Sequence, residues 1–206
     1  MAALRIKSQW FRQGTVKTPQ QTASAMAFIT WRVAQNMLKQ MRSAQFDIEI
    51  GAQYFSFTRE TLVFLLQVLE RMAANHMEEA QRGAFMVALV QRVARILQEN
   101  ADGLMGAPAP DLPSHYDSFI DQYNALSDHY ADFGFGASSG PDFAFVRYLG
   151  HRIEALMPEK DRLWVVDQIM ATEVPEAVQM LGNALRDVLS NEPRAPRKGR
   201  AAATGD

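Results

Sequence analysis

Two apolar runs lie close together near the middle of this chain, and they limit its possible folds more than any other feature. They span residues 62–66 and 84–90, and Asn75 lies between them, where a turn fits. A helix that is apolar on nearly all sides has no solvated face, so other elements must surround it. We therefore expect a helical hairpin over residues 58–105 at the centre of the core, with Thr58 as the cap of its first helix.

Further helices are predicted on both sides of this hairpin. Thr18-Pro19-Gln20-Gln21 has the pattern of a capping box with proline in the first turn. Residues 46–50 alternate apolar and polar, which indicates an extended connector with three side chains in the core. The remaining predicted helices cover residues 18–45, 114–133, 141–157, 159–171 and 175–190. The predicted fold class is all-α, a single-domain bundle of six or seven helices around the central hairpin, with one short extended connector.

The 206 residues fit one domain with two flanking segments. Residues 1–17 form a basic N-terminal arm, residues 18–190 the helical domain, and residues 191–206 a Pro/Arg/Ala-rich tail for which we expect disorder. Trp10-Phe11 is the only bulky apolar feature of the arm. The favoured interpretation is that this aromatic pair docks on the domain, because exposed aromatic side chains are costly. Binding to a nucleic acid or an anionic membrane, or cleavage as a presequence, is the alternative.

Composition excludes several classes of protein. The chain has no cysteine, which removes disulfides and thiolate metal sites and favours a reducing compartment. The chain has no run of about 18 apolar residues, so no transmembrane segment is predicted. The N-terminus lacks the apolar stretch of a secretory signal. We expect a cytoplasmic protein.

Charge is distributed unevenly although the net charge is only −2. Residues 1–46 contain seven basic side chains and no acid, whereas residues 96–146 contain eight acids and no basic side chain. Arg32 and Lys39 lie on the first predicted helix. Four aspartates share one stripe of about 60° on the predicted helix at 114–133, because helical residues advance about 100° each. These aspartates are Asp117, Asp121, Asp128 and Asp132.

Neither packing nor helix propensity explains four aspartates in one stripe, because aspartates repel one another and have a low helix propensity. The candidate partner-binding residues are therefore these four aspartates together with Arg32, Lys39 and Trp10. We expect the basic and acidic faces to meet either within one chain or between two chains.

Signals for chemistry are weak. The pairs His76/Glu79, His129/Asp132 and His151/Glu154 have a spacing that places both side chains on one helix face. Pairing of the histidine with the acid on the helix surface is a simpler interpretation than a metal site. The Gly/Ser-rich residues 133–140 lack the strand and lysine of a phosphate-binding loop, so an ordinary loop is expected. No catalytic motif or cofactor site is identified.

The sequence therefore favours a helical interaction or adaptor protein without catalytic activity, which binds a protein partner or associates with itself as a homodimer. The first alternative is binding of a nucleic acid or an anionic surface through the basic arm and tail. The second alternative is a metal-dependent helical-bundle enzyme.

Overall fold

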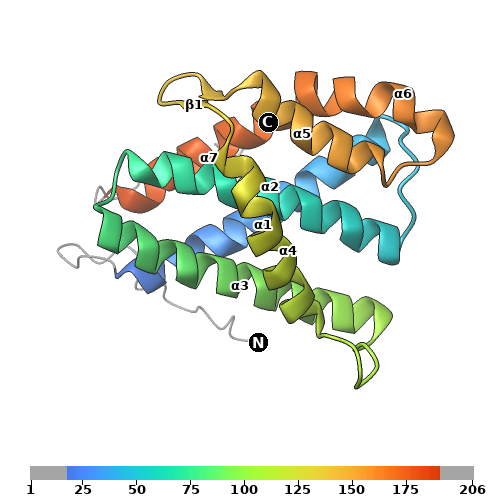
Figure 1. The fold of residues 1–206 in the computed structure, drawn as a ribbon, viewed down its shortest axis with the longest axis horizontal. Helices are drawn as coiled ribbons and strands as arrows, with labels where there is room; N and C mark the ends of the chain where they lie inside the picture. Colours follow the sequence, from blue (N-terminus) through green and yellow to red (C-terminus); the bar gives the residue numbers. More distant parts are fainter. Residues whose placement is uncertain (1–17, 191–206) are drawn as a thin grey trace, which may run out of the picture.

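The computed structural model describes residues 18–190, which form an all-α bundle with one minimal pair of strands (Figure 1). The long helices come first along the chain, and shorter ones follow a proline-containing loop at residues 106–114. The helices are α1 (Pro19–Ser43), α2 (Ala52–Ala74), α3 (Glu79–Met105), α4 (His115–Ala131), α5 (Phe143–Glu154), α6 (Glu159–Gln168) and α7 (Val174–Leu189).

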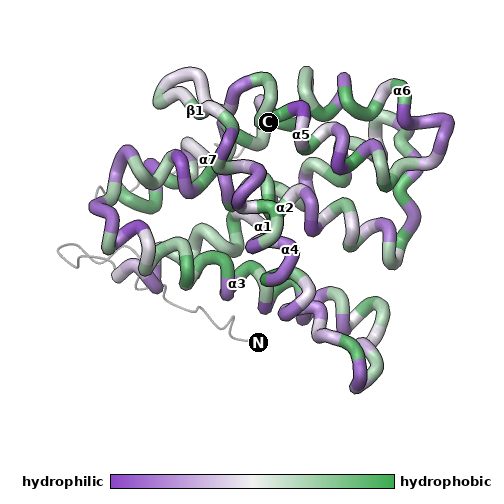
Figure 2. Tube along the Cα trace, viewed as in Figure 1, coloured by the Kyte–Doolittle hydropathy of each residue, from purple (hydrophilic) through white to green (hydrophobic). Residues whose placement is uncertain are grey.

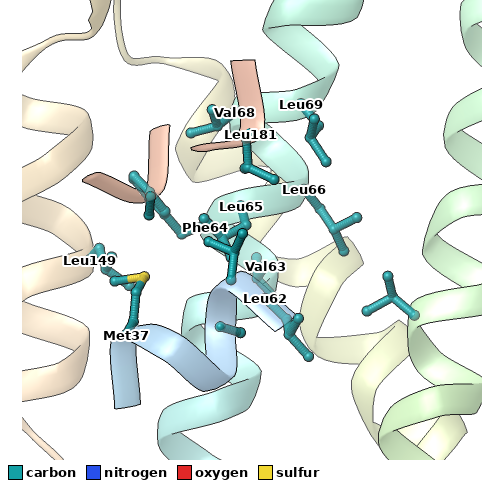
Figure 3. Close-up of a cluster of buried hydrophobic side chains, with 14 of the residues drawn as sticks. Met37, Leu62, Val63, Phe64, Leu65, Leu66, Val68, Leu69, Leu149 and Leu181 are labelled. Carbon is teal, nitrogen blue, oxygen red and sulfur yellow. The ribbon is translucent and has the colours of Figure 1, made fainter. Parts of the chain in front are cut away.

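Helix α2 is the enclosed element of the bundle. Every side chain from Thr61 to Leu69 is buried, and α1, α3, α4, α5 and α7 all pack against this helix. Figure 3 shows its apolar side chains meeting Met37 of α1, Leu149 of α5 and Leu181 of α7. The apolar run at 62–66 therefore forms the centre of the core, as its lack of a solvated face predicts.

Helix α3, by contrast, buries only one face. Its buried positions recur every three or four residues from Phe85 to Ala101, while Val87 is 59% exposed. The prediction that both helices of the hairpin are enclosed is therefore wrong for α3. Its apolar face packs most extensively on α1, which also contacts α7. In Figure 2 the tubes of most helices alternate between green and purple, as expected for helices with one apolar and one polar face.

Helix α4 crosses α2 and α3 at a steep angle (Figure 1). Ser114 caps its first turn: its hydroxyl accepts a hydrogen bond from the backbone N–H of Asp117 at 3.0 Å. The helix ends at Ala131, close to its predicted end. Phe119, Leu126 and Tyr130 are the side chains that it buries.

The connector between α1 and α2 is extended, as expected, but only part of it enters the core. Ile48 is buried and Phe46 is half-buried, whereas Ile50 is exposed, so the expectation of three inserted side chains is wrong at Ile50. Helix α2 begins at Ala52, directly after Gly51 with its φ of 116°. Thr58 is therefore a buried interior residue rather than a helix cap.

Residues 133–142 form a small loop between α4 and α5. The strands β1 (Phe135–Gly136) and β2 (Gly140–Pro141) pair antiparallel, a feature that the sequence did not predict. Asp142 closes the loop, since its carboxylate accepts hydrogen bonds from the N–H of Gly134 at 2.9 Å and of Phe145 at 2.8 Å. It thereby also caps the first turn of α5.

The C-terminal helices are continuous where a break was predicted. A π-helical segment, η2 (Ile169–Glu173), joins α6 to α7 without a loop. Pro175 has no N–H and its ring clashes with the carbonyl four residues earlier in a regular α-helix. A wider π turn before it accommodates the ring, so the chain continues as a helix instead of ending.

None of the helices within residues 18–190 is long and apolar enough to cross a membrane. The arm at 1–17, with Trp10, and the tail at 191–206 lie outside the described residues.

Candidate functional site

The four aspartates of α4 lie on its outer, solvent-facing side. Asp117 is bonded to the Ser114 cap, Asp121 and Asp128 are exposed, and Asp132 is the exposed residue that follows the helix. None of the four forms an ion pair with another side chain in the part of the chain that the structure describes. The stripe predicted from the sequence thus exists as an exposed surface.

The basic side chains of α1 lie on a different part of the molecule. Arg32 and Lys39 are exposed, and the guanidinium of Arg32 lies 5.9 Å from the ring centre of Phe28. Helix α1 packs on α2, α3 and α7, whereas α4 packs on α2 and α3. Within one chain, the structure does not bring the basic and acidic candidates together. A meeting between two chains stays a prediction.

The three histidine–acid pairs differ in the structure. His151 contacts Glu154, with 2.9 Å between Nδ1 and Oε2, whereas His129 stacks on the ring of Tyr148. Over residues 18–190, no group of three or more histidine and acidic side chains is arranged to hold a metal ion.

A row of buried and half-buried polar side chains connects α2 to its neighbours. Glu60 is only 6% exposed, and its carboxylate accepts hydrogen bonds from Nε2 of Gln122 at 2.9 Å and from Nε of Arg152 at 3.0 Å. Arg152 also donates from Nη2, so the contact is bidentate. Two further side chains of α2 continue the row. Gln67 donates a hydrogen bond to the hydroxyl of Ser127, and Arg71 donates hydrogen bonds to the last two backbone carbonyls of α4.

Aromatic side chains fill the space next to this row. Tyr130 lies at their centre, with ring centres 4.9 Å from Phe145 and 5.1 Å from Tyr148. Burial, together with the nearby charge of Glu60, raises the pKa of Tyr130 well above its usual value. The phenol therefore stays neutral, and its hydroxyl has no hydrogen-bond partner within residues 18–190. Because these groups are packed against one another, we interpret the cluster as a clamp between helices rather than as a binding site.

A solvent-facing groove lies between α5 and α6. Its volume is about 570 Å³, which is within the range of ligand-binding clefts. Both helices and the π-helical segment contribute to it. It is lined by Phe143, Arg147, His151, Glu154, Arg162, Leu163, Val166, Asp167, Met170 and Ala171.

The polar side chains along α5 form a chain of hydrogen bonds. Arg147 Nε donates to His151 Nε2 at 3.0 Å, and His151 Nδ1 lies 2.9 Å from a Glu154 carboxylate oxygen. An arginine can only donate, so Nε2 is the acceptor and the proton of a neutral imidazole is on Nδ1. Both ring nitrogens are thus occupied, and His151 has no free nitrogen with which to activate a nucleophile.

Large apolar side chains stand exposed on the same two helices. Leu163 is 80% exposed, Trp164 is 66% exposed and Phe143 is 65% exposed. The guanidinium of Arg147 lies 5.8 Å from the ring centre of Phe143. We call these residues, Phe143, Arg147, His151, Glu154, Leu163 and Trp164, the α5–α6 surface. It combines apolar area with charges of both signs.

Sequence reasoning missed this surface, although a signal for it was present. Residues 163–166 are Leu-Trp-Val-Val, and four consecutive apolar residues cannot all face one side of a helix. In the structure Val165 is buried, which turns Leu163 and Trp164 toward solvent. The chain matches no protein-family model, and neither the curated proteins nor the solved structures contain a significant match to it.

Proposed function

We propose that this protein is a helical interaction protein, not an enzyme, and that it binds a protein through the α5–α6 surface. The single observation that carries the proposal is the exposure of Phe143, Leu163 and Trp164 on one helical hairpin. Isolated exposed apolar residues are ordinary, but large ones gathered beside charged groups are typical of protein interfaces. Tryptophan is also among the residues that contribute most binding energy where partners meet.

Two observations support binding over catalysis. The histidine in the groove has both nitrogens engaged by Arg147 and Glu154. The other dense polar group, around Glu60, lies beside aromatic side chains and holds α2, α4 and α5 together. Neither arrangement presents a nucleophile beside a free base.

A photo-crosslinking amino acid placed at Leu163 tests the proposal. In cells that express the full chain, we expect irradiation to join position 163 to a protein, either another copy or a different partner. The same amino acid at Val87 is the matched control, because Val87 is an exposed apolar residue on α3, which does not pack against α5 or α6. Equal or absent crosslinking at the two positions would contradict the proposal.

A second candidate is binding to an anionic polymer or surface. It is favoured by Arg32 and Lys39, which are exposed on α1 and have no acidic partner among the described residues. If the basic segments bind DNA or RNA, affinity for generic nucleic acid falls steeply with salt and is lost when residues 1–17 and 193–206 are deleted. A salt-independent signal would rule this candidate out, and a salt-dependent signal that survives the deletion would assign binding to α1 and not to the arm and tail.

A further inference from the structure

Helix α2 turns polar side chains toward α4, although most of its surface is apolar. Glu60, Gln67 and Arg71 are seven and four residues apart, so at about 100° per residue they share one side of the helix. Glu60 and Gln67 are only 6% and 3% exposed. They contact Gln122 and Ser127 of α4, and Arg71 contacts the last carbonyls of that helix. The side of α2 that α4 covers is therefore a polar one.

Apolar contacts hold α4 chiefly at its C-terminal end. There the ring centre of Tyr130 lies 4.9 Å from that of Phe145 and 5.1 Å from that of Tyr148. Over residues 115–127, which also pack on α3, Phe119 and Leu126 are the only fully buried side chains. The half-buried apolar side chains of this part are Tyr116, Ile120 and Tyr123. The N-terminal part of α4 is thus the more weakly held.

The polar contacts of this part can be exchanged for contacts with water. If α4 leaves, Glu60 loses the hydrogen bond from Gln122 but keeps both bonds from Arg152, which belongs to α5. Arg59 loses His115, 3.2 Å from its Nη2, but burial lowers the pKa of Arg59 and its Nε has no partner within residues 18–190. Water would hydrate this guanidinium. Detachment therefore leaves no buried charge without a partner.

The N-terminal part of α4 is also a weak helix. The aspartates on its outer side repel one another and have a low helix propensity. The segment follows the loop at 106–114, in which Gly106 has a φ of 83° and three prolines interrupt any continuous helix with α3. Neither its own propensity nor the chain before it keeps this part of α4 in place.

We propose that residues 115–127 detach from α2 and α3 as a unit and unwind, while the Tyr130 end of α4 and the rest of the bundle stay folded. Detachment uncovers Glu60 and Gln67, two polar side chains that the closed bundle hides. Helix α4 is thus a movable cover over a polar surface of α2. The inference does not depend on binding at the α5–α6 surface.

Hydrogen exchange on the unmodified full chain tests the proposal. A short helix without tertiary contacts is marginal in water, so the detached segment exchanges its amide hydrogens. Relative to intrinsic rates, residues 119–127 should exchange at least about tenfold faster than residues 62–69 of α2. Equal protection of the two segments would overturn the proposal. Protection that changes steadily from residue 119 to residue 127 would also overturn it, because it indicates fraying and not opening as a unit.

Cysteine labelling tests whether the opening uncovers α2. The chain has no cysteine, so one introduced thiol gives the whole signal. Gln67→Cys places a thiol beneath α4, and the matched control Thr58→Cys places one at a buried position nine residues earlier, on the opposite side of α2. Position 67 should react at least about tenfold faster than position 58. Leu185→Val on α7 should speed the reaction at position 58, which requires global unfolding, and leave position 67 unchanged.

Equal reactivity at the two positions would overturn the inference, and so would a Leu185→Val effect of the same size on both. In either case both thiols become accessible only through global unfolding. Circular dichroism checks that the variants are folded. If a cysteine variant does not fold, hydrogen exchange on the unmodified chain decides the question by itself.

Discussion

Glu60 and Glu173 are the two carboxylates buried in the described part of the molecule, and their surroundings differ. Glu60 accepts three hydrogen bonds, two of them from the guanidinium of Arg152. Glu173 accepts one, from Gln168 at 2.9 Å, and its second oxygen has no partner. A buried charge that is fully hydrogen-bonded is tolerated, whereas one left without partners disfavours the fold.

Removal of Arg152 should cost more stability than removal of the charge on Glu60. Arg152→Ala leaves a buried carboxylate with only Gln122, and we expect a loss of about 3 kcal/mol in the free energy of unfolding. Glu60→Gln leaves the half-exposed guanidinium able to rehydrate, and a loss of about 1.5 kcal/mol is expected. Urea denaturation measures both.

The control for this comparison is the exposed pair between Lys160 and Asp47, which are 3.0 Å apart. Lys160→Ala should leave stability unchanged within error, since exposed ion pairs contribute little. Equal losses in Arg152→Ala and Lys160→Ala would show that the Glu60 pair is not a clamp.

Glu173 should make stability depend on pH. Burial raises the pKa of Glu173, so the folded state keeps a proton that the unfolded chain releases near the ordinary pKa of 4.5. The contribution of Glu173 to the free energy of unfolding is therefore complete below pH 4.5, decreases as pH rises through the raised pKa, and is constant above it. Glu173→Gln should remove this decrease, because glutamine does not titrate.

Urea denaturation of wild type and Glu173→Gln at two pH values tests this. The variant should match the wild type at pH 4 and exceed it at pH 8 by about 1 kcal/mol, the cost of one buried group without a partner. A difference that is the same at both pH values would contradict the assignment.

At the scale of elements, close helix packing at Gly150 determines how α5 and α6 meet. Glycine inside a helix costs about 1 kcal/mol relative to alanine, so Gly150 predicts a contact that needs the missing side chain. The structure confirms that prediction for α5, where Val166 lies opposite. Gly182, inside α7, predicts a close contact for the same reason, but a Cβ added there would lie 3.6 Å from the flexible end of Met72, which is ordinary contact.

Alanine substitutions at two helical glycines should therefore have opposite effects. Gly150→Ala pushes against the γ-methyl of Val166, a β-branched side chain with little rotamer freedom in a helix, and we expect a loss of about 1 to 2 kcal/mol. Among the residues that the structure describes, no atom lies within 4 Å of a Cβ added at Gly83 on α3, so Gly83→Ala should gain about 0.5 to 1 kcal/mol of stability.

Thermal or urea denaturation gives both values. The double variant Gly150→Ala/Val166→Ala should recover part of the loss, because it removes the methyl group in contact. No recovery would mean that the backbone of α6, and not the Val166 side chain, limits the approach.

For the whole molecule, two surfaces are candidates for binding a protein. The uneven distribution of charge predicts that basic α1 meets acidic α4 between chains, whereas the proposed function places the contact on the α5–α6 surface. Arg32 and Lys39 are far along the chain from Arg147 and lie on a helix that does not belong to that surface.

A charge reversal on α1 separates the two. We expect Arg32→Glu/Lys39→Glu to leave photo-crosslinking from position 163 unchanged and Arg147→Glu to weaken it, both measured in cells that express the full chain. The opposite outcome, together with a dimer that weakens as salt rises, would favour pairing of α1 with α4.

Much of the architecture could be predicted because local patterns record burial directly. Apolar runs and the Thr18 capping box each indicate a helix from adjacent residues alone, and both are confirmed. Prediction failed where one residue type fits two local structures. Thr58 resembles a cap but lies inside α2, and Pro175 resembles a break but follows a π turn.

The sequence by itself determined the all-α class, the burial of the 62–66 run and the exposed aspartate stripe, because each depends on the periodicity of one helix. Only the tertiary structure decided which charges lie near one another. It joined Glu60 to Arg152 across 92 positions of chain, and it left Leu163 uncovered beside Arg147 and Glu154. The reason is physical: the exposure of a side chain depends on the helices packed around it, and no local pattern specifies those neighbours.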